Sequence, residues 1–120
     1  MSTYKRQKLS GSTDGKAIKV AATSIGSGTT IHTASATTTA GLGDLVTLFA
    51  YNSDTVDRML TIGWGGTTSP DDLIDVYLQP KGGGLVLVVA DLIIVNSLVV
   101  KAAADAANVV TIHGYANIIS

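Results

Sequence analysis

The apolar stretch over residues 85–101 constrains the fold more than any other segment. It reads LVLVVADLIIVNSLVVK. A membrane-spanning helix needs roughly 20 apolar residues in a row, whereas one charged and two polar residues interrupt this run. Most of its apolar residues are Val and Ile, whose branched Cβ atoms favour strands over helices. The stretch therefore predicts two core strands, Leu85–Ala90 and about Leu92–Ala102, that are joined or bent near Asp91.

The overall composition agrees with a fold built from strands. All nine acidic residues of the 120-residue chain are Asp, and Asp prefers caps and turns, whereas the absent Glu is a good helix former. The length suits one domain with its own core. The chain has no cysteine, which excludes disulfides and thiolate metal sites. No apolar signal core is present near the N-terminus, so neither secretion nor a membrane anchor is indicated.

Alternating apolar and polar residues predict about seven to nine short strands linked by Gly, Ser, Asn and Asp turns. Leu45–Asn52 and Arg58–Trp64 are expected to pair as an antiparallel hairpin. Ser69–Asp72 has the N-cap and first-turn residues of one helical turn. The resulting fold class is all-β, an antiparallel, jelly-roll-like β-sandwich over residues 16–120. Other strands are expected near residues 16–23, 30–34, 74–79 and 108–120, and Ser35–Gly43 fits either an edge strand or a loop.

The first 15 residues are polar and lack periodicity, which predicts an extended N-terminal arm. Residues 1–19 carry a net charge of +4 and residues 20–120 a net charge of −5. One interpretation is a solvated, flexible tail. The other is an arm that docks on an acidic neighbour, either a second copy or a larger scaffold. Nucleic acid is a weak option, because the arm holds little basic charge and a single aromatic residue. The residues expected to bind through this arm are Tyr4, Lys5, Arg6, Lys8 and Leu9.

The chain is also poor in charge. Charged residues make up 14% of it, against about 25% in ordinary soluble domains. A small domain with so few charges has difficulty covering its whole surface with polar groups. We therefore expect a homo-oligomer or a component of a larger assembly.

No pattern in the sequence indicates a catalytic, cofactor or metal site, and none is expected. His32 and His113 are the only histidines, and without cysteines or a paired histidine motif they favour structural or interfacial roles. A triad of Ser, His and Asp is spatial and stays open, although no Gly-x-Ser-x-Gly elbow occurs. The carboxylates at 71, 72 and 75 could offer oxygens to calcium, but their Ser-Pro context favours a cap.

Two further features are candidates for partner binding. Trp64 is the only tryptophan, and it could stack on a sugar, anchor an interface or, as we favour, pack in the core. Thr111, His113 and Tyr115 alternate with apolar residues of the last strand. They form an outward row, which is as consistent with a solvent face as with an interface.

The final third of the chain resembles the closing strands of small β-sandwich structural proteins of tailed-bacteriophage virions, the capsid decoration or cement proteins. The residues that carry the resemblance are Pro80–Val89 (PKGGGLVLVV) and Ala102–Ile119 (AAADAANVVTIHGYANII). The resemblance spans about forty residues and consists of a Gly-rich turn, core strands and a terminal VTIHGY strand. It does not extend to the first seventy residues.

This resemblance implies a non-enzymatic virion protein that is made in the host cytoplasm and sits on the capsid surface. Such proteins form oligomers, often trimers, that brace capsid subunit junctions, and an N-terminal arm commonly reaches a neighbour. The implied partners are the major capsid protein or another virion protein and further copies of the chain, with no nucleic acid or membrane. A neck, tail or head-fibre component, or a glycan- or receptor-binding module, is the alternative.

Overall fold

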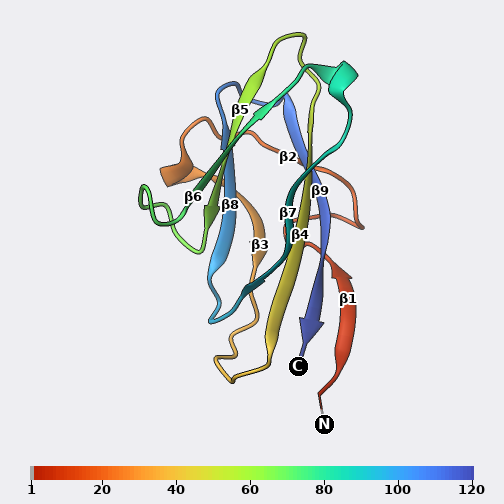
Figure 1. Ribbon diagram of the computed structural model, residues 1–120, viewed down its shortest axis with the longest axis vertical. Coiled ribbons are helices and arrows are strands. Elements are labelled where there is room, and N and C mark those ends of the chain that lie inside the picture. Colours follow the sequence, from red (N-terminus) through yellow and green to blue (C-terminus); the bar gives the residue numbers. More distant parts are fainter. Residues whose placement is uncertain (1) are drawn as a thin grey trace.

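The computed structural model describes residues 2–120 and consists of two antiparallel β-sheets packed against each other (Figure 1). The all-β sandwich expected from the sequence is therefore confirmed. The elements in chain order are β1 (Tyr4–Lys8), β2 (Ile18–Lys19), the 3-10 turn η1 (Ile25–Ser27), β3 (Thr29–Thr33), β4 (Gly43–Asn52), β5 (Arg58–Trp64), β6 (Leu73–Leu78), the 3-10 turn η2 (Lys81–Gly83), β7 (Val86–Ile94), β8 (Val99–Ala104) and β9 (Val110–Ile119).

The strands divide between the sheets in a nested pattern. Sheet A has the order β1-β9-β4-β7, with β2 also paired to β9, and sheet B has the order β3-β8-β5-β6. Along the chain, β5 pairs with β6, β4 with β7, β3 with β8 and β2 with β9. The chain is thus a long antiparallel ribbon that is folded at β5–β6 and rolled so that β4 also meets β9 and β5 meets β8.

The core lies between the sheets and is built from the alternating side of each strand. On β4 the side chains of Val46, Leu48 and Ala50 point inward, and on β9 those of Val110 and Ile112 do so. This alternation is the one predicted from the sequence, because successive side chains of a strand point to opposite faces. Trp64 at the end of β5 packs against the same core.

The N-terminal segment belongs to sheet A, where the sequence predicts an arm. β1 pairs with the end of β9 over five positions, from Tyr4 opposite Ile119 to Lys8 opposite Tyr115. Leu9 is 1% exposed and part of the core. The polar sequence of this segment gives no sign that it pairs with another strand. In the structure it pairs with the edge of β9. The arm therefore stays unconfirmed, and the boundary expected after residue 15 does not separate Tyr4–Leu9 from the sandwich.

Two expectations about local structure are wrong. β4 and β5 do not form a hairpin, since β4 lies in sheet A and β5 in sheet B, so the chain crosses between sheets after Asn52. Asn52 is buried there and its Nδ2 donates to the carbonyl oxygens of Val56 and Leu78. Ser69–Asp72 forms a turn without a helix. Within residues 2–120 there is no helix of the length and apolar character needed to cross a membrane.

The apolar stretch that suggested two core strands is divided differently. β7 continues through Asp91, which adopts a φ of 51° at an irregularity in the pairing with β4. The chain reverses instead at Asn96 and Ser97, both with positive φ. β8 is an inner strand of sheet B, whereas β7 is an edge strand that pairs only with β4 among the described residues. The most apolar segment of the chain therefore lies partly at the surface.

Candidate functional site

The outer face of sheet A changes in character from one edge to the other. Residues that pair across antiparallel strands point to the same face, so the strand register defines rows across the sheet. Three of the four rows begin with an apolar or aromatic residue on β7 or β4, and three of the four end with a basic residue on β1 or β2. The rows are Ile93–Leu45–Asn117–Arg6, Thr47–Tyr115–Lys8, Leu87–Phe49–His113 and Tyr51–Thr111–Lys19.

The basic edge is held in a defined geometry by Arg6. Its Cζ atom lies 4.4 Å from the centroid of the Tyr115 ring, and its Nε donates to Oδ1 of Asn117 at 3.0 Å. A guanidinium over a tyrosine ring is attracted by the ring quadrupole, an interaction of roughly 0.5–1 kcal/mol at exposed sites. The Lys8 ammonium donates to the Ser12 carbonyl at 3.0 Å. The edge therefore presents cations whose positions are partly fixed.

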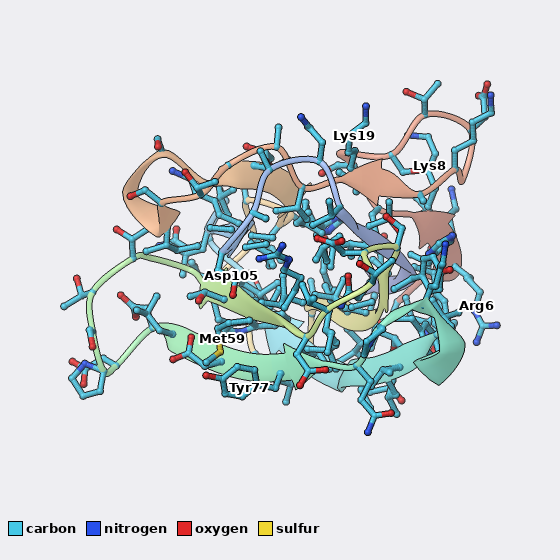
Figure 2. The ribbon with its side chains drawn as sticks, turned by 90° about the horizontal axis from the view of Figure 1, so that it is seen from above. Arg6, Lys8, Lys19, Met59, Tyr77 and Asp105 are labelled. Carbon is cyan, nitrogen blue, oxygen red and sulfur yellow. The ribbon has the colours of Figure 1, made fainter. Side chains whose placement is uncertain are left out.

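The two outer faces of the sandwich differ in charge. Figure 2 shows Arg6, Lys8 and Lys19 on one side of the molecule, away from Met59 and Tyr77 of sheet B. On the outer face of sheet B, the Thr61 hydroxyl donates to Asp75. Because the basic residues of β1 and β2 gather beside β9, the asymmetry seen along the sequence becomes a basic edge in space.

The structure brings together two groups of residues that the sequence suggested separately. The row Thr111, His113 and Tyr115 lies on the outer face of β9, and the segment Tyr4–Lys8 lies beside it in β1. Trp64 does not join them, because it lies on sheet B and packs against the core. Leu9 is buried in the core, so it does not lie on this face either.

His113 has the least satisfied side chain of this face. Its Nδ1 is enclosed and has no hydrogen-bond partner among the described residues. The register places the ring between Phe49 on one side and the gap between β1 and β2 on the other. The Phe49 ring supplies neither a donor nor an acceptor to this atom.

Sequence reasoning missed the pair formed by His32 and Asp44. Its atoms Nε2 and Oδ2 are 2.7 Å apart, and both residues are at most 2% exposed. The Ser10 backbone N–H donates to Nδ1 of His32 at 3.0 Å, so the histidine proton is on Nε2 and points to Asp44. Ser35 donates to Asp44 through both its backbone N–H and its hydroxyl. Every polar atom of the pair is engaged and enclosed, which favours a structural role.

Two of the acidic residues after Pro70 accept hydrogen bonds from nearby residues of the fold. Oδ2 of Asp72 accepts the backbone N–H of Thr68 at 3.1 Å, and Asp75 is bonded to Thr61 across the strands. Among residues 2–120, no three His, Asp or Glu side chains are grouped so that they could hold a metal ion. A surface hollow of about 270 Å³ beside this turn is lined by Gly65, Leu98 and Lys101, among others. Lys101 is the single charged residue in its lining.

No protein-family model, no curated protein and no solved structure gave a significant match to the chain.

Proposed function

We propose that the chain is a non-enzymatic structural protein of a tailed-bacteriophage virion, of the capsid decoration or cement type. It would bind the capsid surface at subunit junctions through the basic edge of sheet A. The observation that carries the proposal is the row pattern of this sheet, in which Arg6, Lys8 and Lys19 border an aromatic and apolar face. The occupant of the edge is an acidic surface of the major capsid protein or of another virion protein.

The strand order supports this assignment at the level of architecture. With β1 and β2 counted as one interrupted strand, eight strands form two four-stranded sheets from a single rolled ribbon. We interpret this order as a jelly roll, an arrangement that occurs in viral capsid and lectin domains and in other proteins. A fold by itself does not define a function, so the proposal depends on the chemistry of sheet A.

The basic edge is suited to docking on protein rather than to catalysis. Tyrosine and arginine are enriched at interface cores, and here Tyr115 and Arg6 are stacked before any partner arrives. A side chain held in place loses less conformational entropy on binding, and each immobilised side chain costs about 0.5–1.5 kcal/mol. Opposite charges across an interface add specificity and accelerate association.

The proposal is tested by sedimentation of the purified protein with capsids from which it has been removed. The wild-type protein is expected to pellet with the capsids, and added salt should weaken this binding because exposed charges are screened. The double variant Arg6→Glu, Lys8→Glu is expected to bind at least about tenfold more weakly, which corresponds to about 1.4 kcal/mol. Binding of the variant at wild-type strength, or no binding by the wild-type protein, would refute the proposal.

A matched control comes from the opposite sheet. The variant Thr61→Glu, Tyr77→Glu adds two negative charges on the outer face of sheet B and should bind capsids like the wild-type protein. Circular dichroism of each variant confirms that the fold is retained. A deletion of the basic segment should end at Lys8, because Leu9 is part of the core.

The alternative role as a fibre or glycan-binding module had Trp64 as its candidate residue. Trp64 packs against the core, so its position does not support stacking on a sugar.

A further inference from the structure

The four residues after β1 lead from sheet A to the edge of sheet B. We call this segment, Leu9–Ser12, the strap. Gly11 donates its backbone N–H to the Ile31 carbonyl at 3.0 Å, and the Ser10 hydroxyl accepts the backbone N–H of Thr33 at 2.7 Å. β3 pairs with β8 on its other side. The strap therefore covers the edge of β3 that no strand of sheet B occupies.

The buried ring of His32 is bonded to the strap through one nitrogen and to β4 through the other. The Ser10 backbone N–H donates to Nδ1 at 3.0 Å, and a backbone N–H can only donate, so Nδ1 carries no proton. The proton of the neutral ring is therefore on Nε2, which lies 2.7 Å from Oδ2 of Asp44. Ser35 donates to both oxygens of the same carboxylate.

A second proton on this ring has only one place to go. Since Nε2 already carries a proton, formation of an imidazolium puts the new proton on Nδ1, where it would face the Ser10 N–H across 3.0 Å. Two donors cannot form a hydrogen bond with each other, and in the interior each would be left without a partner. Protonation of His32 and the contact with Ser10 therefore exclude each other.

Asp44 is the charged group that faces the ring among the described residues. The strap and residues 34–42 and 95–98 contain no charged side chain. Lys101, the one charged residue of β8, lines the surface hollow. The basic residues of β1 are exposed; they are Lys5, Arg6 and Lys8. The Asp44 carboxylate attracts an imidazolium, but it contacts Nε2 and leaves the conflict at Nδ1 in place.

We propose that His32 is a pH-sensitive switch that holds the strap closed at neutral pH and opens it when the ring takes up a proton. Opening breaks the contacts that Ser10 and Gly11 make with β3. The edge of β3 then exposes backbone donors and acceptors that another strand could pair with. The pairing of β1 with β9 does not involve His32, so the opening is local to the strap.

The sign and the size of the effect follow from proton linkage. The open form, with its imidazole in water, takes up a proton below about pH 6.5, whereas the closed form has no site for it. Acid therefore favours the open form. Between about pH 7.5 and about pH 5, the equilibrium shifts toward the open form by roughly thirtyfold.

Amide hydrogen exchange followed by NMR measures this opening residue by residue. Protection factors, which correct for the intrinsic effect of pH on exchange, should fall by roughly thirtyfold from about pH 7.5 to about pH 5 at the amides of Ser10, Gly11 and Thr33. The Val20 amide, which donates to Val110 within sheet A, is the internal reference. Its protection factor should change by less than about twofold, because the strap does not cover it.

The other histidine of the chain supplies a matched control. His113→Asn leaves every strap contact in place and should show the same fall in protection as the wild-type protein. His32→Asn lacks the titrating ring, so protection of its strap should be the same at both pH values.

The nitrogen chemical shifts of His32 test the proposal in the wild-type protein, without any substitution. At neutral pH the shifts should show a proton on Nε2 and none on Nδ1. The signals of an imidazolium should appear only as the Ser10 amide loses its protection.

Four results would overturn the inference. They are strap protection that does not change with pH, an equal fall at Val20, a fall in His32→Asn as large as in the wild-type protein, and an imidazolium at His32 while the Ser10 amide stays protected. All of these measurements use the pure protein, so their outcome is independent of the proposed capsid role, which is tested by sedimentation with capsids.

Discussion

His32 of β3 and Asp44 of β4 join the two sheets through a contact of 2.7 Å between Nε2 and Oδ2 in the interior of the sandwich. The same pair fixes the N-terminal segment, because the backbone N–H of Ser10 donates to the other nitrogen of His32. Sheet A, sheet B and the segment after β1 therefore meet at one buried polar cluster. Removing any member leaves groups in the interior without partners, and this is costly.

Asp44→Ala should lower the free energy of unfolding by about 3 kcal/mol, because it leaves the His32 Nε2–H and the Ser35 hydroxyl buried and unpaired. Urea denaturation followed by tryptophan fluorescence measures the change. Asp75→Ala is the control, since Asp75 is exposed and its carboxylate accepts the Thr61 hydroxyl, and it should change stability by less than about 0.5 kcal/mol. Equal effects of the two substitutions would contradict the role given to the cluster.

Leu9→Ala should also destabilise the protein, by about 2–5 kcal/mol, because it removes a buried side chain and leaves a cavity. Leu85→Ala changes the same residue type at an exposed position and should have little effect on the monomer. Thermal unfolding of both variants at low protein concentration gives the comparison. If Leu9→Ala unfolds like the wild-type protein, residues 1–15 behave as the arm that the sequence predicts.

Gly114→Ala should disrupt β9 because a Cβ atom at this position would overlap the backbone carbonyl of Thr47 on β4. The strands would have to separate, and the expected loss of stability is about 3 kcal/mol or more. Gly82→Ala is the matched control, since nothing lies near its added Cβ atom. The free energies of unfolding of the two variants, measured in urea, should differ clearly. Similar values would show that the close approach of β4 and β9 tolerates a methyl group.

Asp54 should make the stability depend on pH in the acidic range. The pKa of its carboxyl lies below the ordinary value of 3.8, first because the Thr55 backbone N–H donates to it and next because Arg58 does. A carboxyl with a lowered pKa in the folded state stabilises that state above its unfolded pKa, and this contribution is lost as the pH falls through the folded pKa.

The measurement compares the wild-type protein with Asp54→Asn at neutral pH and at about pH 3 or below. The wild-type protein should be the more stable of the two at neutral pH, and the difference should shrink on acidification. Asp57→Asn serves as the control for a neighbouring exposed carboxylate. A difference between wild type and Asp54→Asn that is constant or grows as the pH falls would contradict this assignment.

Much of the local structure could be predicted from the sequence. The range of β5 was predicted to the residue, and the inward and outward alternation of β4 and β9 was predicted correctly. Alternation of side chains is a local property of a strand, so it can be read without knowing any partner. The hairpin between β4 and β5 was predicted wrongly, because closeness along the chain does not determine whether two strands share a sheet.

The candidate site was predictable only in parts. Arg6 and Asn117 are 111 positions apart, and His32 and Asp44 carry no spacing that marks them as partners. Both contacts exist because the ribbon is rolled, and the rolling brings β1 beside β9 and β3 near β4. No signal in the sequence indicates either pair.

The sequence by itself determined that this protein is all-β, where several of the strands lie, β5 among them, and which side of β4 and β9 faces the core. The scarcity of charge and the basic character of the first residues are likewise properties of the sequence alone. Only the tertiary structure decided where each strand lies in a sheet. The most apolar segment supplied the edge strand β7 and the start of the inner strand β8 rather than two core strands, because burial depends on how many neighbours a strand acquires, and its own composition does not set that number.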